Sequence, residues 1–335
     1  MYRTDRTDLE TRENQPMTLR TFTRFALALV MALFTSGLSA QALTDGAVID
    51  PDRGVAYLMN SRGGIDALDL DRGSLRWSSR AAAKPLAITG GRLLALALPR
   101  GAEPNIVTLD ASGRAVTSAA LALPAGVRPM LKDDLTGSFR IEALSGPGGD
   151  LLLQWTATSV PARGIEQLDN ALVVGEESTP SEPVTTSGTV RVHPATGQLY
   201  SATAADAEAL REHSADALRR GLEALSSGPR TFAAVAGPHR LVSARQAESQ
   251  PDRRYRWTIS DGATKLGEVE SSVATSAFAV RGMTLYYIVP AGGRLAAGSE
   301  MKRRQLTLRA IDLATGAERW SRPLVDTRYF GPFPR

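Results

Sequence analysis

The side chains that could carry out chemistry are few in this sequence. Histidine occurs only at His193, His213 and His239, and none of them stands at metal-ligand spacing from another. Cysteine is absent, which excludes thiolate catalysis, cysteine-ligated zinc and iron–sulfur clusters. No Gly-x-Ser-x-Gly elbow, phosphate-binding loop or dinucleotide fingerprint occurs. The sequence therefore predicts no catalytic residue, no cofactor, no cofactor-binding residue and no metal ligand.

Neighbouring carboxylates are the remaining candidates for acid–base chemistry. Glu176–Glu177 and Asp133–Asp134 both fall in stretches that we expect to be loops. A glycoside hydrolase needs two carboxyl groups on either side of one glycosidic bond. Nothing in the surroundings of these pairs distinguishes them from ordinary loop charge, so they do not define a site.

A repeated sequence pattern marks the structural units of the fold. Ile65–Trp77 reads IDALDLDRGSLRW and Leu308–Trp320 reads LRAIDLATGAERW, which is nearly the same pattern. Weaker copies lie at Val107–Gly113 and Val190–Gly197, where His193 stands in place of the aspartate. A strand–turn–strand unit that recurs in this way is typical of a propeller or a solenoid.

At the centre of the repeat an aspartate is followed four residues later by a glycine, in the pattern Asp-x-x-x-Gly. The aspartate side chain can accept backbone N–H groups in an Asx turn, and the glycine supplies the positive φ of a tight hairpin. A catalytic role for Asp69 and Asp312 is the alternative. We favour the turn, because turn aspartates are far commoner, and we expect Trp77 and Trp320 at the end of the repeat to fill the gap between adjacent units.

Short runs rich in β-branched and aromatic residues lie between the turns, as expected of strands. Leu93–Leu98, Leu151–Trp155 and Thr284–Val289 are almost wholly apolar, which predicts strands buried on both faces. Phasing on the turn gives five units of four strands. They run over about Ala47–Arg80, Leu86–Leu121, Ser138–Thr203, Thr231–Glu270 and Ser276–Leu324.

The repeat resembles the PQQ-like (quinoprotein-type) β-propeller repeats, in the superfamily of quinoprotein-like and WD40-like folds. The family pattern is matched at Ala310, Asp312, Thr315, Gly316 and Trp320, and in the first unit at Ala67, Asp69, Gly73 and Trp77. The resemblance implies an all-β propeller of about five four-stranded antiparallel blades, as a non-enzymatic member. Relatives usually have more blades, so either the ring is small or the long third unit contains more than one. We expect the first and last blades to meet by side-chain packing.

The first part of the chain predicts export. Residues 17–42 combine a basic start, an apolar run of about half the ~20 residues that span a membrane, and a small-residue cleavage site. Cleavage after Ala40 and after Ala42 both fit, and residues 1–16 are interpreted as a non-native extension. Without a cysteine there is no lipid attachment site. We therefore expect residues 43–335 to form one propeller domain in the periplasm or outside the cell, without stable membrane insertion.

Three insertions interrupt the units, at 159–187, 204–230 and 290–305, and a fourth long segment covers 122–137. In an up-and-down blade all four leave the same end of the strands, where binding residues usually lie. The segment at 204–230 has apolar residues at helical spacing, with Thr203 as its expected cap. We expect its apolar stripe to dock on its own domain.

Composition and charge restrict the classes of function that fit this chain. The net charge of +4 comes from 39 basic and 35 acidic residues spread along the chain, so nucleic-acid binding is not indicated. The sequence favours a non-catalytic binding or scaffolding protein whose partner is another envelope protein or a glycan. The alternatives are a quinone-dependent dehydrogenase-like or glycan-active enzyme, and an outer-membrane assembly factor.

Overall fold

The computed structural model describes residues 41–99, 103–132, 137–145, 151–159, 165–168, 171–174, 183–193, 196–212, 231–246, 254–290 and 306–325. The chain divides into two compact units, Met1–Leu38 and Ser39–Arg335, and the described residues all belong to the second. The predicted extension at 1–16 and nearly all of the predicted signal peptide at 17–42 lie outside them.

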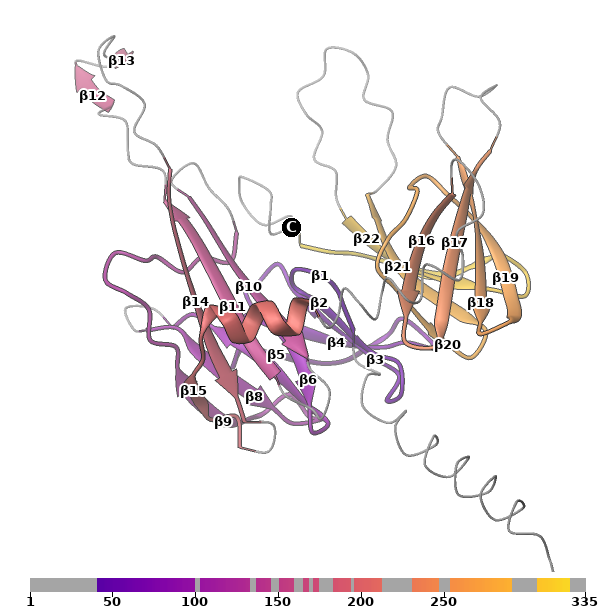
Figure 1. Cartoon of the computed structure of the whole chain (residues 1–335), viewed down its shortest axis with the longest axis horizontal. Coiled ribbons are helices and arrows are strands. Elements are labelled where there is room, and N and C mark those ends of the chain that lie inside the picture. Colours follow the sequence, from indigo (N-terminus) through magenta and orange to yellow (C-terminus); the bar gives the residue numbers. More distant parts are fainter. Residues whose placement is uncertain are drawn as a thin grey trace, which may run out of the picture. The chain divides into compact units, whose positions relative to one another are not determined.

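Five antiparallel sheets of four or five strands make up most of the described fold, and within each of them neighbouring strands follow one another in chain order (Figure 1). We number these sheets as blades 1 to 5. Blade 1 holds β1 (Gln41–Thr44), β2 (Ala47–Asp50), β3 (Val55–Met59), β4 (Ile65–Asp69) and β5 (Leu75–Ser79). Blade 2 holds β6 (Lys84–Thr89), β7 (Arg92–Ala97), β8 (Asn105–Leu109) and β9 (Ala115–Ala120).

Blade 3 holds β10 (Gly137–Ser145), β11 (Leu151–Ser159), β14 (Val184–Val192) and β15 (Leu199–Ser201). Blade 4 holds β16 (Thr231–Ala236), β17 (His239–Arg245), β18 (Tyr255–Asp261) and β19 (Thr264–Ser271). Blade 5 holds β20 (Phe278–Arg281), β21 (Thr284–Pro290), β22 (Leu306–Asp312) and β23 (Glu318–Pro323). A separate hairpin, β12 (Ile165–Leu168) and β13 (Ala171–Val174), lies between β11 and β14.

This architecture confirms the predicted all-β fold of β-propeller blades. Five meander sheets stand where five units were predicted, and the one helical segment of the described residues covers 204–212. Blade 1 carries one strand more than predicted. That strand, β1, pairs with β2, and Leu43 within it is buried in the core.

Alternation of apolar and polar residues explains how single strands are oriented. In β18 the side chains of Tyr255, Trp257 and Ile259 are buried, while those between them are at least partly exposed. Runs without alternation are covered on both sides, as predicted: every residue of β21 from Thr284 to Val289 is buried. Such a strand needs a neighbouring sheet on each face.

Shared cores join the blades pairwise. Blades 1 and 2 share one hydrophobic cluster, blades 2 and 3 a second, blades 4 and 5 a third, and blades 5 and 1 a fourth. The predicted side-chain seam between the last and the first blade is therefore confirmed. No such cluster joins blades 3 and 4 within the described ranges.

Candidate binding surfaces

The repeated turn is built as the sequence predicts. In blade 5 the Asp312 carboxylate accepts the backbone N–H groups of Ala314 (2.9 Å) and Thr315 (3.1 Å). Gly316 closes the turn with φ of +71°, a conformation that side-chain-bearing residues avoid. Asp69 and Asp110 accept backbone N–H groups in the same way. These carboxylates therefore already accept hydrogen bonds from the backbone of their own turns.

The hydrogen bonds of the turns lower the pKa of each aspartate. The Arg76 guanidinium is the largest cause at Asp69, and backbone N–H donation by Thr315 is the largest at Asp312. The Ser112 hydroxyl contributes most at Asp110, whose pKa falls to about 2. A carboxyl group held ionised in this way is poorly suited to donate a proton as a general acid at neutral pH.

Acid should therefore weaken the turns. A carboxyl whose folded pKa is depressed stabilises the fold above its unfolded value of about 4, and that contribution disappears as pH falls through the folded value. We expect the free energy of unfolding to drop between about pH 4 and pH 2, measured by urea denaturation across this range. Asp110→Asn keeps a turn acceptor and should flatten the dependence. A variant with the slope of the wild type would contradict this assignment.

Histidine replaces aspartate in the turn of blade 3. The Nδ1 atom of His193 accepts the backbone N–H of Thr196 at 3.3 Å, so the ring takes over the acceptor role. His239 starts β17 directly after the turn at Gly237. Both are therefore turn or strand-end residues, and His213 lies outside the described residues.

Trp320 closes the seam between blades 5 and 1. Its ring packs on Gly73, where a Cβ atom would lie only 2.7 Å from the indole, so the turn of blade 1 must have glycine there. The indole N–H donates to the Leu70 carbonyl at 2.9 Å. Two residues later, the Arg322 guanidinium donates to the Gly73 carbonyl at 2.8 and 3.0 Å.

Trp77 repeats this arrangement between blades 1 and 2. Its ring covers Gly113, and its indole N–H donates to the Ala111 carbonyl at 2.8 Å. Two residues later, the Ser79 hydroxyl donates to the Gly113 carbonyl at 2.6 Å. Trp77 and Trp320 thus pack between blades, which confirms their predicted role. Each seam combines an aromatic ring on a glycine with hydrogen bonds to two carbonyls of the neighbouring turn.

Strand register identifies, in the outermost strand of every blade, the residue that corresponds to Trp77 and Trp320. Each tryptophan pairs with the residue two before the turn aspartate, Ala67 for Trp77 and Ala310 for Trp320. We call the residue so paired the seam residue. From blade 1 to blade 5 the seam residues are Trp77, Thr117, Tyr200, Gly267 and Trp320.

Only blades 1 and 5 have tryptophan at this position, and in blade 4 the seam residue is Gly267. A Cβ atom at Gly267 would lie 2.1 Å from the Leu313 carbonyl oxygen, so β19 approaches the turn of blade 5 more closely than any other residue would allow. The residue two positions later, where blades 1 and 5 have the donors Ser79 and Arg322, is the buried Val269. Both hydrogen-bond donors of the seam are therefore missing here.

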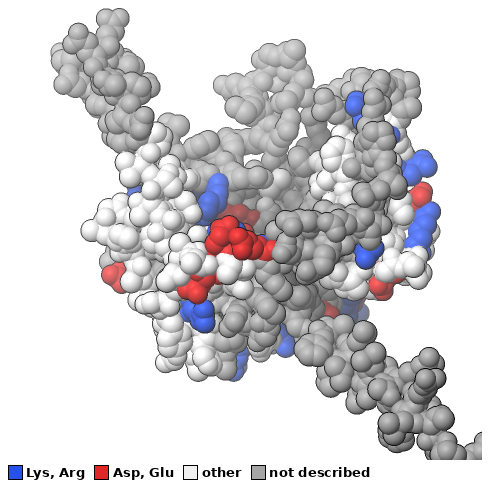
Figure 2. Space-filling view, in the orientation of Figure 1, with Lys and Arg blue, Asp and Glu red and all other residues white. Residues whose placement is uncertain are grey.

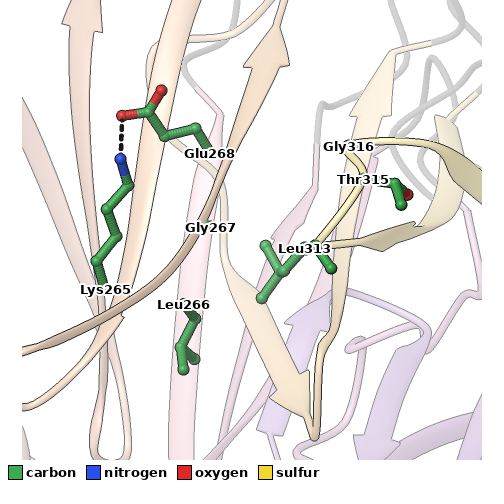
Figure 3. A pocket seen from close by; sticks show the side chains of 8 residues that line it. Lys265, Leu266, Gly267, Glu268, Leu313, Thr315 and Gly316 are labelled. Carbon is green, nitrogen blue, oxygen red and sulfur yellow. Dashed lines mark hydrogen bonds and ion pairs between the residues drawn. The ribbon is translucent and has the colours of Figure 1, made fainter.

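A groove of about 410 Å³ lies at this place. It is lined by Lys265, Leu266, Gly267 and Glu268 of β19 and by Leu313, Ala314, Thr315 and Gly316 of the turn between β22 and β23. Figure 3 shows the two elements facing each other, with an ion pair between Lys265 and Glu268 (2.8 Å) on the β19 side. We call this groove the β19 groove. Sequence reasoning missed it.

The long connections lie at the other end of the strands. Residues 121–136, 160–183, 202–230 and 291–305 all join strands at one end of the sheets, which we call the loop end. At the opposite end, the turn end, no connection is longer than that at 193–198. Most residues of the long connections lie outside the described ranges, including Glu176–Glu177 and Asp133–Asp134.

The helical segment is the best-described part of these connections. Thr203 caps it as predicted: its hydroxyl accepts the N–H of Asp206 (3.2 Å), and the Asp206 carboxylate accepts the N–H of Thr203 (2.8 Å). Ala207 and Leu210 pack against blade 3, and the rest of the predicted stripe, from Ala217 to Leu225, lies outside the described residues. In Figure 2 acidic side chains gather over this segment, with basic ones beside them.

The described residues carry neither a metal-binding cluster nor a membrane-spanning helix. They hold no group of three or more histidine or carboxylate side chains arranged to bind a metal ion. They also contain no helix of the length and apolar character needed to cross a membrane.

Comparison with known proteins gives only distant likenesses. No protein family profile and no curated protein matches the sequence. Among solved structures, BamB from Moraxella catarrhalis is similar over 83% of this chain, with 12% identity and a TM-score of 0.25. The chain spans 63% of the length of that protein.

Two further structures are similar at the same level. The computationally designed Ika8 protein matches over 88% of this chain and 91% of its own, with 11% identity and a TM-score of 0.30. The β-propeller domain of Cps50 (Swd1) from Myceliophteria thermophila matches over 84% of this chain and 86% of its own, with 12% identity and a TM-score of 0.22. The propeller blades are identified from the five sheets of the chain itself.

Proposed function

We propose that this protein is an exported, non-catalytic β-propeller that binds another protein of the cell envelope through the loop end of its blades. One observation carries the proposal: every long connection leaves the sheets at that end, whereas the turn end has only tight hairpins. Rigid sheets that present long loops on one side are a common scaffold for binding.

The chemistry of the turns supports a binding role over a catalytic one. The recurring aspartates, which are the obvious candidates for acid–base work, are held ionised and are engaged by their own backbone. Export is supported by the sequence of residues 17–42.

Site-specific photo-crosslinking in living cells tests the proposal. A photoreactive amino acid at Val184, which is 57% exposed where β14 begins at the loop end, should give adducts with an envelope protein. So should Glu208, which is exposed on the helical segment. The matched control is Ser112, exposed in a turn-end hairpin of blade 2. Adducts at Ser112 with none at Val184 or Glu208 would overturn the assignment of the loop end.

A further inference from the structure

The first strand of the described fold contacts more than one blade. β1 (Gln41–Thr44) lies at the edge of blade 1 opposite the outermost strand β5. Beyond its pairing with β2, it contacts β6 of blade 2 and β20 and β21 of blade 5. A strand of only four residues therefore touches blades 1, 2 and 5.

Leu43 anchors this strand in the apolar core. Its side chain is 6% exposed and lies in the cluster shared by blades 5 and 1, among residues of β2, β3, β21 and β22. Directly after β1, Asp45 in the turn to β2 forms ion pairs with Lys84 of β6 and Arg140 of β10. The start of the described chain thus has partners in four of the five blades.

The two cleavage sites predicted from the sequence leave different lengths of β1. Cleavage after Ala40 gives a chain that begins at Gln41 and contains the whole strand. Cleavage after Ala42 gives a chain that begins at Leu43 and lacks the two residues that make the first two pairs with β2. The fold therefore distinguishes two products that the pattern of small residues does not.

The two products also place the new α-ammonium group in different surroundings. In a chain that begins at Leu43, this charge belongs to the residue whose side chain is buried in the core. Moving an unpaired ammonium group toward an apolar interior is costly. In a chain that begins at Gln41, the charge lies two residues earlier, beyond the exposed Ala42. The shorter product therefore loses strand pairing and gains an unfavourable charge.

We propose that the mature protein begins at Gln41, after hydrolysis of the Ala40–Gln41 peptide bond, and that its N-terminal strand β1 joins blades 1, 2 and 5. The hydrolysis consumes one water and leaves a carboxylate on Ala40 and the α-ammonium on Gln41. Less stable molecules are removed by cellular proteases, so the difference between the products determines which one accumulates. This proposal rests on the export proposed above and goes beyond it by assigning the processed bond.

Mass spectrometry of the intact protein tests the processed bond. The protein is purified from the envelope fraction of cells that express the full chain. Its main species should begin at Gln41, either as glutamine or as the pyroglutamyl residue that N-terminal glutamine forms with loss of ammonia. A main species that begins at Leu43 would overturn the proposal, and so would an exported chain that keeps residues 17–40.

The variant Ala42→Leu separates the two cleavage sites. A large residue directly before the cut is incompatible with cleavage after position 42, because that position requires a small side chain. Ala42 lies after the proposed bond and is exposed in the fold, so the variant should be exported and should begin at Gln41 as the wild type does. Accumulation of uncleaved Ala42→Leu protein would show that the wild type is cut after Ala42.

Three chains that start at Ser39, Gln41 and Leu43 test the role of β1 in stability. Each ends at Arg335 and is released from a fusion without added residues. The chain from Leu43 should unfold at a lower urea concentration than the chain from Gln41, or fail to fold. The chain from Ser39 is the matched control, because it shifts the start by two residues without shortening β1, and its midpoint should equal that of the chain from Gln41. Equal midpoints for all three would contradict the role assigned to β1.

The location of the protein separates the failure of this proposal from the failure of the proposed function. Protein found only in the cytoplasm, with its N-terminus intact, would overturn both. Exported protein that begins at Leu43 would overturn the cleavage proposal alone. Exported protein that begins at Gln41 but gives no crosslinks at Val184 or Glu208 would support the cleavage proposal and contradict binding at the loop end.

Discussion

Replacing Trp257 with alanine should lower the free energy of unfolding by about 4–5 kcal/mol, the upper part of the range for buried tryptophan. Trp257 is fully buried in the core that joins blades 4 and 5, and its ring contacts that of Tyr287 edge to face at 4.8 Å between centroids. Its indole N–H is shared by the carbonyls of Val273 (3.0 Å) and Ala274 (3.1 Å) in the link to blade 5.

The size of this effect follows from the missing seam tryptophan. At the seams where Trp77 and Trp320 lie between blades, a ring on the outermost strand adds to the packing that joins the two blades. Blade 4 has Gly267 at that position, so the blade 4–5 seam depends on the ring of Trp257 from the neighbouring strand β18. Losing it leaves a cavity in the core and two carbonyls without their donor.

Urea denaturation followed by circular dichroism measures the loss. Trp257→Phe is the matched control, because it keeps an aromatic ring and removes the N–H donor; we expect it to cost about 1–2 kcal/mol. Trp320→Ala should cost about 3 kcal/mol, the lower part of the same range, because Trp320 is only partly buried. An alanine variant at 257 as stable as the phenylalanine variant would show that the ring does not hold this seam.

The sequence predicted the parts of the fold that depend on local chemistry. The Asp-x-x-x-Gly turn could be recognised because Asx hydrogen bonding and positive φ each select one or two residue types. The wholly apolar run at Thr284–Val289 predicted a doubly covered strand, because a residue exposed on either face would be polar. Thr203 was identifiable as a helix cap from the same kind of local requirement.

What the sequence did not reveal depends on pairs of residues far apart in the chain. β1 is too short to show periodicity, and its place in blade 1 is fixed by pairing with β2 and burial of Leu43. The β19 groove lies where Gly267 has no side chain, and this equivalence to Trp77 and Trp320 is recognised only when strand register aligns the three residues. An absence of this kind carries no signal until the repeats are superimposed.

The second large loss of stability is expected at a buried ion pair. The side chain of Lys84, at the start of β6, is fully buried, and its ammonium lies 2.5 Å from a carboxylate oxygen of Asp45 in the turn between β1 and β2. Arg140 of β10 lies 3.7 Å from the other oxygen. The Asp45 carboxylate therefore links the first strands of blades 1, 2 and 3.

Asp45→Asn should lower the free energy of unfolding by about 3–5 kcal/mol, because it removes the negative charge beside a buried ammonium while the cost of burying that ammonium remains. Adding Lys84→Met to this variant should recover much of the loss, since an apolar side chain of similar length can occupy a buried site at little cost. Urea denaturation of the wild type, both single variants and the double variant forms a complete cycle. Additive effects of the two substitutions would show that the pair is not coupled.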